Sequence, residues 1–382
     1  MKITRIAAIP LSYKLPEGQT VKVGVGATLK RDAIIVRVET DEGLTGYGES
    51  HPGRSPSAVT ALVNHTLNPL LAGMDPCNVV GVWARVNRMQ LSSHGLGAGA
   101  ALALSGIDMA LWDIRAKAAN MPLYRLLGGS RKRLPAYAGG ISMAFQEPES
   151  LVDEARSYLE RGYRAIKLRL GDNARDDVAR VNAVRAGIGS DVDILTDANT
   201  SWTLADARRV LPALAEARVG WIEEPFSALD FGSYRILAGI DPSVPIAAGE
   251  NHYTRWDFAR LLEDKAVTIW QPDLSKTGGI TEALRIAAMA SAFGIALHPH
   301  CSATGINHAA TLHFLSALDN GGYFEACVSK FNPLRDMFGQ SFEIGTDGCV
   351  EAPEMPGIGL EIDEKIFEDF PAIDGPGYIV KF

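Results

Sequence analysis

The sequence predicts a parallel (β/α)8 barrel that follows an α+β domain. Between about residues 134 and 328, short apolar segments alternate with amphipathic ones, the pattern of parallel βα units. Ionisable residues recur near the ends of seven apolar segments, at intervals of 23 to 30 residues, and each interval is the length of one βα unit. The first 130 residues have a different pattern, which indicates a separate domain.

The N-terminal domain is expected to span residues 1–130. It begins with extended segments that favour an antiparallel meander, and longer segments with helical spacing follow. The extended segments are 5–15, 33–43 and 45–50, and the helical ones are 57–73 and 97–129. The tail, residues 353–382, has no helical period, and we expect it to pack against this domain.

The barrel is expected to span residues 131–352. The segments between its strands are apolar at helical spacing, and two of them end in glycine. They are 150–162, 203–217, 254–265 and 280–294. The eight strands are expected at 136–141, 165–170, 193–199, 221–225, 245–250, 268–274, 295–300 and 323–328.

Seven strand ends carry an ionisable residue, where a purely structural position would be apolar or small. Active sites of such barrels lie at the carboxyl ends of the strands, so this pattern predicts an active site. The seven residues are Lys167, Asp197, Glu223, Glu250, Asp273, His300 and Glu325.

Asp197, Glu223 and Glu250 come from three successive strands, about 4.8 Å apart in such a sheet. Three carboxylates so placed repel one another unless a cation lies among them. Oxygen ligands with open positions suit Mg²⁺, so we predict a magnesium site. The alternative is that each carboxylate caps a helix or pairs with an arginine.

Lys167 and Arg169 are two residues apart in a strand, so their side chains share one face. Unpaired buried charges are costly, so these cations are expected to face the metal site and an anionic substrate. The alternative is a pair of surface cations. Asp273 beside His300 predicts a general base, because a carboxylate fixes the imidazole tautomer and raises its basicity. His300 could instead be structural.

Composition excludes other classes of function. With 37 Lys and Arg against 45 Asp and Glu, the net charge is −8, and no basic block predicts a nucleic-acid partner. No apolar run is long enough to span a membrane, and the N-terminus lacks the features of a signal peptide. The four cysteines show no CxxC spacing, so we expect neither disulfides nor a zinc site, and a cytoplasmic location.

Several motifs together resemble the enolase superfamily, mandelate racemase subgroup. They are "SGIDMALWDIRAKAANMPLYRLLGG", "KLR", "TDAN", "WIEEP", "AAGEN" and "PDLSKTGG…HPH". The resemblance covers nearly the whole chain. It implies a capping domain on a modified TIM barrel, (β/α)7β, and a homo-oligomer.

The resemblance also implies roles for single residues. Asp197, Glu223 and Glu250 match the Mg²⁺ ligands, and the second glutamate of "WIEEP", Glu224, is expected to point away. The His300–Asp273 pair matches the base. Glu325 matches the family residue that hydrogen-bonds the substrate carboxylate, and Lys167 matches the lysine that polarises this carboxylate. Lys276 belongs to a background shared with muconate-lactonizing relatives, which have Lys at the position of Asp273.

One departure from the racemase pattern bears on the reaction. That pattern is Lys-x-Lys with a basic second lysine, whereas Arg169 stands here, and guanidinium stays protonated in proteins. One-base chemistry is therefore favoured: His300 removes a proton α to a carboxylate, and loss of a β-hydroxyl gives a 2-keto-3-deoxy acid. This predicts an acid-sugar dehydratase. The alternatives are an epimerase or racemase, a sugar-lactone cycloisomerase, or a non-catalytic binding protein.

The expected partner is a small carboxylate substrate. In the family, two loops of the capping domain close over the barrel, here about residues 15–30 and 50–56. They offer Lys22, His51 and Arg54 as candidate substrate-binding residues, which suit a hydroxylated acid or diacid; the alternative is that they are solvated. Two more candidates lie in the barrel, Asn199 and His298, the latter one layer deeper than His300.

Overall fold

The computed structural model describes residues 1–336, 342 and 344–379. Its larger part is a ring of eight parallel strands in the order β12-β11-β10-β9-β8-β7-β6-β13. Leu297 forms a parallel bridge with Gly321, next to β13, which closes the ring. The strands are β6 (Leu134–Gly139), β7 (Ala165–Arg169), β8 (Asp193–Asp197), β9 (Ile222–Glu223), β10 (Ile246–Ala248), β11 (Ile269–Trp270), β12 (Ala296–Leu297) and β13 (Phe324–Cys327).

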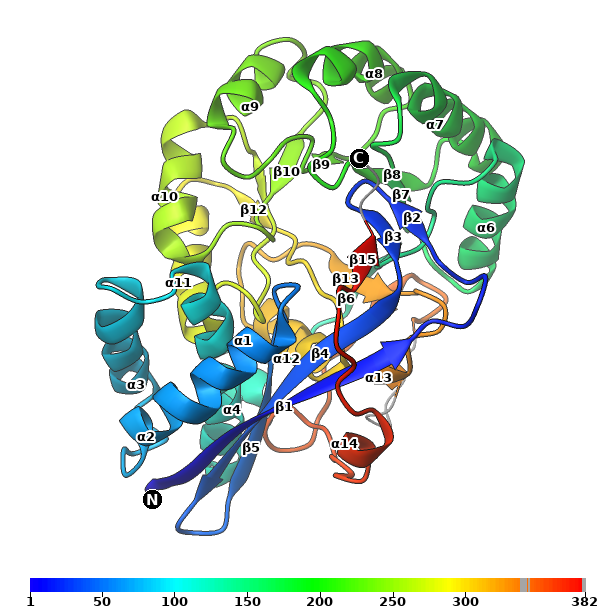
Figure 1. Cartoon of the computed structure of the whole chain (residues 1–382). Coiled ribbons are helices and arrows are strands. Elements are labelled where there is room, and N and C mark those ends of the chain that lie inside the picture. Colours follow the sequence, from blue (N-terminus) through cyan, green and yellow to red (C-terminus); the bar gives the residue numbers. More distant parts are fainter. Residues whose placement is uncertain (337–341, 343, 380–382) are drawn as a thin grey trace.

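A helix follows each of the first seven barrel strands and covers the outside of the ring (Figure 1). In the described residues after β13 there is one helix of four residues before the chain returns to the outer edge of β6 as β14 (Cys349–Val350). The predicted (β/α)7β barrel is confirmed. The helices are α6 (Pro148–Glu160), α7 (Ala174–Ile188), α8 (Leu204–Glu216), α9 (Phe231–Ala238), α10 (Thr254–Asp264), α11 (Gly279–Ala292), α12 (Gly305–Ser316) and α13 (Pro333–Asp336).

The N-terminal part is an antiparallel sheet with helices on one face, as the predicted α+β cap requires. Its strands, in the order β1-β4-β5, are β1 (Ile3–Lys14), β4 (Lys30–Thr40) and β5 (Thr45–Ser50). Its helical segments are α1 (Pro56–Ala61), η1 (Leu62–Leu67), α2 (Asn68–Leu71), α3 (Val79–Val86), η2 (Asn87–Leu91), α4 (Ala98–Ala118) and α5 (Leu123–Leu126).

The C-terminal segment lies against this cap. After α14 (Ile366–Asp369), the strand β15 (Tyr378–Ile379) pairs with β3 (Gly26–Thr28), which pairs with β2 (Lys22–Val23). The small sheet was not expected, because residues 15–30 show a loop composition. Through this sheet the N-terminal segment with β2 and β3 and the C-terminal segment with β15 both lie over the mouth of the barrel (Figure 1).

The helix α4 joins the cap to the barrel. Sixteen of its 21 residues are buried, because it packs on β5 on one side and on α11 on the other. Gly46 and Gly48 permit the first contact, since a Cβ atom at either would clash with the α4 backbone. On the other side the Trp112 indole donates to Thr281 Oγ1 at 2.9 Å, and the Asp108 carboxylate accepts from the Thr281 backbone. The mouth of the barrel is thereby held against the cap.

No helix among the described residues combines the length and the apolar character needed to cross a membrane.

Candidate active site

Carboxylates from three neighbouring strands lie near one another at the mouth of the barrel. Asp197 is the last residue of β8 and Glu223 the last of β9, and the parallel ladder places the two side by side. Glu250 lies two residues beyond the end of β10. Asp197 and Glu223 are buried, and the Glu250 side chain is 13% exposed. Burial on this scale is stable only when each charge has a partner.

Lys167 is one of these partners. Its Nζ atom lies 3.0 Å from Glu223 Oε1 and 2.9 Å from Glu325 Oε1, and Asp197 Oδ2 is 3.4 Å away. The side chain is completely buried. Burial alone would lower the pKa of Lys167, but Glu223 and Glu325 outweigh it and raise the pKa. Lys167 is therefore held as a cation.

Arg169 is the second cation on this face. One guanidinium nitrogen donates to Asp197 Oδ2 and, at 3.0 Å, to Asn199 Oδ1, and the other donates to the Gly140 carbonyl. Burial lowers the pKa of Arg169, whereas Asp197 and Glu223 raise it, and the net direction is upward. Three fixed partners orient the guanidinium in a way that one ammonium group could not.

His300 lies across the ring from these cations, after β12. Its Nδ1 atom lies 2.7 Å from Asp273 Oδ2 and its Nε2 atom 2.6 Å from Glu250 Oε2. Asp273 Oδ1 accepts from the backbone and hydroxyl of Ser275, both at 2.7 Å, and from Asn307. Although burial opposes it, His300 and Lys276 lower the pKa of Asp273. Asp273 therefore remains ionised and fixes the His300 ring.

Glu325, on β13, completes the ring of strand-end residues. One of its oxygens accepts from the Gly140 backbone and from Lys167, and the other accepts from the Cys301 backbone at 3.1 Å. Burial raises the pKa of Glu325, but Lys167 and His300 lower it to about 2. The Glu325 carboxylate is thus fixed between Lys167 on one side of the site and the segment that contains His300 and Cys301 on the other.

The donor set fits a hard divalent cation in composition. Burial and Asp197 raise the pKa of Glu223 to about 7, and burial and Glu250 raise that of Glu224 well above its usual range. Besides burial, neighbouring carboxylates contribute to both shifts, and a divalent ion would offset the repulsion between these carboxylates. In the described part of the chain no three His, Cys, Asp or Glu side chains converge on one point. Instead, the contacts pair Asp197 with Arg169, Glu223 with Lys167 and Glu250 with His300.

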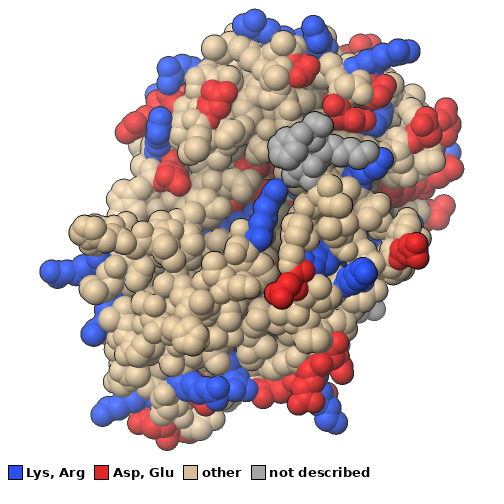
Figure 2. Space-filling model, viewed as in Figure 1, with Lys and Arg blue, Asp and Glu red and all other residues tan. Residues whose placement is uncertain are grey.

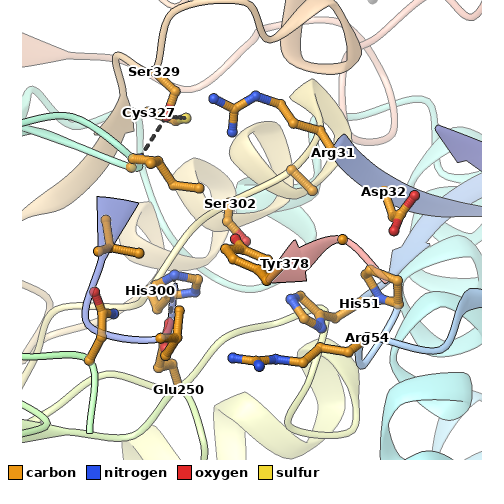
Figure 3. A pocket seen from close by; sticks show the side chains of 18 of the residues that line it. Arg31, Asp32, His51, Arg54, Glu250, His300, Ser302, Cys327, Ser329 and Tyr378 are labelled. Atoms are coloured by element: carbon orange, nitrogen blue, oxygen red, sulfur yellow. Dashed lines mark hydrogen bonds and ion pairs between the residues drawn. The ribbon is translucent and has the colours of Figure 1, made fainter. Parts of the chain in front are cut away.

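A cavity of about 220 Å³ opens between this cluster and the cap. Among the expected residues, Arg169, Asn199, Glu250 and His300 line it from the barrel, and His51 and Arg54 line it from the cap. In Figure 2 blue Lys and Arg side chains lie at the hollow in the middle of the face shown. Figure 3 shows His300 and Glu250 on one side of the cavity and His51 and Arg54 on the other.

His51 is fixed to the same network. Its backbone N–H donates to the Ser275 carbonyl at 3.0 Å, so the cap loop is anchored beside Asp273. The Gly53 N–H donates to His51 Nδ1 at 3.0 Å, which places the ring proton on Nε2. Burial, with Lys276 nearby, lowers the pKa of His51 to about 3. His51 is a neutral hydrogen-bond donor at the cavity.

Two expected substrate-binding residues lie away from the cavity. Lys22 is exposed on β2, and its neighbour Val23 lines the cavity instead. His298 lies one layer below the site, where its Nδ1 accepts from the Tyr323 backbone and its ring packs 5.0 Å from that of Trp221. Since this layer is aromatic and buried, His298 is placed to support the barrel interior.

Glu224 differs from its expected position. It borders the cavity, and Asn251 donates to both Glu224 and Glu250. The reason is local: Glu224 has a φ of +38° just after β9 ends, so the alternation of faces expected of a strand does not continue through it.

Some cavity residues were not assigned to the site by the sequence. Arg31 and Tyr378 lie in the cap and the C-terminal segment, and neither belongs to a motif with periodic spacing. Lys276 was noted only as family background, although its Nζ lies 3.5 Å from Glu250 Oε2. Of these three residues, only Lys276 could have been assigned to the site from the sequence, because it follows the predicted site residue Asp273 by three positions.

Comparison with known proteins is consistent with this architecture. The family model described as "Mandelate racemase / muconate lactonizing enzyme, N-terminal domain" matches residues 11–128. The one described as "Enolase C-terminal domain-like" matches residues 150–366.

Among relatives, the arabinonate dehydratase of Saccharolobus solfataricus is 35% identical over 342 residues, 89% of this chain and 90% of that protein. The 3,6-anhydro-alpha-L-galactonate cycloisomerase of Streptomyces coelicolor is 34% identical over 363 residues, 94% of this chain and 96% of the other.

Solved structures agree. An enolase superfamily member from Polaromonas is 68% identical, with a TM-score of 0.98 over 100% of both chains. A racemase from Streptomyces coelicolor with bound magnesium is 32% identical, with a TM-score of 0.86 over 97% of this chain and 100% of that one.

The capped barrel, its strand-end cluster and these similarities define the protein as an enzyme. It belongs to the mandelate racemase/muconate lactonizing enzyme family of the enolase superfamily, as its motifs predicted. Its relatives include dehydratases and cycloisomerases named for sugar acids.

Proposed function

We propose that this enzyme is a Mg²⁺-dependent acid-sugar dehydratase that forms a 2-keto-3-deoxy acid from a mono- or diacid. One observation carries the proposal: the imidazole of His300 is oriented by Asp273 at 2.7 Å, across the barrel from two buried cations, Lys167 and Arg169. This arrangement provides a proton acceptor on one side and positive charge on the other. The relative named arabinonate dehydratase supports the choice of reaction.

In this proposal Asp197, Glu223 and Glu250 hold the metal ion. When bound, magnesium stabilises negative charge on the substrate carboxylate as a Lewis acid. Lys167 and Arg169 add fixed positive charge on the same side. Glu325, which is ionised in this structure, would donate a hydrogen bond to the substrate carboxylate only after it takes up a proton as enediolate character develops. If together they accelerate proton transfer by about 10¹⁰, they lower the barrier by roughly 14 kcal/mol.

His300 carries the proton. Its Nε2 takes the proton from the carbon next to the carboxylate, while Nδ1 keeps its hydrogen bond to Asp273. The imidazolium then returns that proton to the departing β-hydroxyl, which leaves as water. The resulting enol tautomerises to the keto acid. In the structure Nε2 contacts Glu250, and this nitrogen would be free to accept a proton if Glu250 turned to hold the metal ion.

A cycloisomerase is the second candidate, because the relative with that name is 34% identical over nearly the whole chain. An epimerase is disfavoured because Arg169 replaces the second base. A non-catalytic binding protein would have no need for the complete set of base, cations and carboxylates.

A screen separates these possibilities. Mono- and diacid sugars are incubated with the enzyme and Mg²⁺, and 2-keto acid formation is scored. Keto acid formation supports the dehydratase. A new ring or diastereomer without loss of water would replace it with an isomerase, and no turnover in any class would contradict both candidates.

A further inference from the structure

Two arginines of the cap enter the cavity without a carboxylate partner. Arg31, on β4, and Arg54, after β5, both line the cavity. Within 4.0 Å of either guanidinium the described residues place no carboxylate oxygen. Arg31 donates instead to the backbone carbonyls of Phe331 and Lys330, each at 3.0 Å. Among the described residues, the other Lys and Arg side chains that line the cavity are paired with carboxylates.

Those other groups account for the local charge. Lys30 pairs with Asp32 at 3.0 Å, and both line the cavity. His51 is neutral because burial lowers its pKa to about 3. On the barrel side, Lys276 faces Glu250. The cap side of the cavity therefore has uncompensated positive charge from Arg31 and Arg54, although the chain as a whole carries −8.

The placement of Arg54 is specific. Its backbone is left-handed, with φ of +62°, and its guanidinium carbon lies 5.3 Å from the centre of the Tyr378 ring. Figure 3 shows Arg54 reaching toward Glu250 and His300, whereas the Arg31 guanidinium lies toward Ser329 and Cys327, with Tyr378 between the two arginines. A stacked guanidinium keeps its in-plane donors available for an oxyanion.

We propose that Arg54, assisted by the charge of Arg31, binds a second anionic group at the end of the substrate remote from the reacting carboxylate. The preferred substrates are then acid sugars with two anionic ends: an aldarate, or an aldonate phosphorylated at its terminal hydroxyl. This inference rests on the proposed function, and it chooses between the mono- and diacids that the proposed function leaves open.

The test compares matched substrates. The enzyme is assayed with a six-carbon aldarate, the aldonate of the same configuration and the terminally phosphorylated aldonate. We expect kcat/KM to be at least about tenfold higher for one dianion than for the aldonate, as for one partly exposed charge pair. The better of the two dianions identifies the group as carboxylate or phosphate.

Two substitutions assign the effect to Arg54. Arg54→Gln should reduce the dianion-to-aldonate ratio by about tenfold, whereas Arg54→Lys should retain part of it. Arg88→Gln removes the same charge from an exposed position on η2, outside the cavity, and should leave the ratio unchanged. An aldonate used as well as both dianions, or equal effects of Arg54→Gln and Arg88→Gln, would overturn the inference.

A binding measurement separates this inference from the proposed function. If no acid yields a 2-keto acid, the dehydratase proposal fails, and calorimetric titration with glutarate and valerate still tests the second subsite. Tighter binding of glutarate that is lost in Arg54→Gln supports the subsite. Equal binding of the two acids by the unmodified enzyme contradicts it.

Discussion

Arg169 gives the sharpest test of one-base chemistry. In D2O, the substrate epimer whose C2 proton faces His300 should exchange that proton or react. The other epimer presents its proton to Lys167 and Arg169, which both donate hydrogen bonds to carboxylates. Neither cation has a lone pair to accept a proton while it remains charged.

The size of the effect follows from the ordinary pKa values. At pH 8 an arginine with its ordinary pKa is neutral in roughly 10⁻⁴·⁵ of molecules, a penalty of about 6 kcal/mol. A lysine with a pKa of about 10.4 is neutral in roughly 10⁻²·⁴, a penalty of about 3 kcal/mol or 250-fold. Neighbouring carboxylates raise the pKa of both residues here, so these are lower limits.

The assay is deuterium incorporation at C2, followed by mass spectrometry for each epimer separately. We expect exchange of the second epimer to be at least about 250-fold slower than that of the first. Arg169 lines the cavity, so Arg169→Lys, which keeps the charge but has a pKa about two units lower, should raise the exchange that passes through position 169 by up to about 100-fold. Exchange of both epimers within tenfold of each other by the unmodified enzyme would refute the reasoning and favour an epimerase.

Three further outcomes are expected. His300→Asn should lower kcat by at least about 10³ with an unchanged circular dichroism spectrum, and a loss below tenfold would exclude His300 as the base. Removal of metal with EDTA should abolish turnover and added Mg²⁺ should restore it; full activity of the metal-free enzyme would contradict the proposed carboxylate role. Burial lowers the pKa of His313 to about 4, below its unfolded value near 6.5, so the folded state stays neutral where the unfolded state gains a proton. His313 should therefore cost no stability above pH 6.5 and about 2 kcal/mol at pH 5, and His313→Gln should reduce the loss of unfolding free energy between pH 7 and pH 5 by that amount, as denaturant titrations would measure.

The barrel could be predicted because its signals are local and periodic. Each strand is a short apolar run, and each strand end repeats at the length of one βα unit, so Asp197, Glu223 and Glu250 could be assigned to one rim. The sequence pattern of the cap is less regular, so its strand pairing was harder to predict. The small sheet of β2, β3 and β15 joins residues more than 340 positions apart, and pairing over such a distance has no signature in either segment.

The same limit applies to the cavity. Tyr378 borders the site because β15 pairs with β3, and Arg31 borders it because its guanidinium binds carbonyls of the segment after β13. Alternation along a strand also failed at Glu224, where a positive φ interrupts the pleat. The sequence allowed candidate residues to be predicted one by one at the strand ends, whereas the convergence of residues from distant segments was set by tertiary pairing.

Lys167 and Arg169 on β7 hold the carboxylates of the site in place, and their charge bears on which side of the substrate can lose a proton. Lys167 lies deeper and is shared by Asp197, Glu223 and Glu325, so it joins three strands at the base of the site. Arg169 lies nearer the cavity and fixes Asp197, a proposed metal ligand, to the Gly140 carbonyl of the first barrel strand's loop. A lysine at 169 could not make both contacts in one plane and would be more easily deprotonated. In the proposed mechanism the guanidinium therefore orients a metal ligand and excludes a base at the same position, so that proton transfer is assigned to His300 alone.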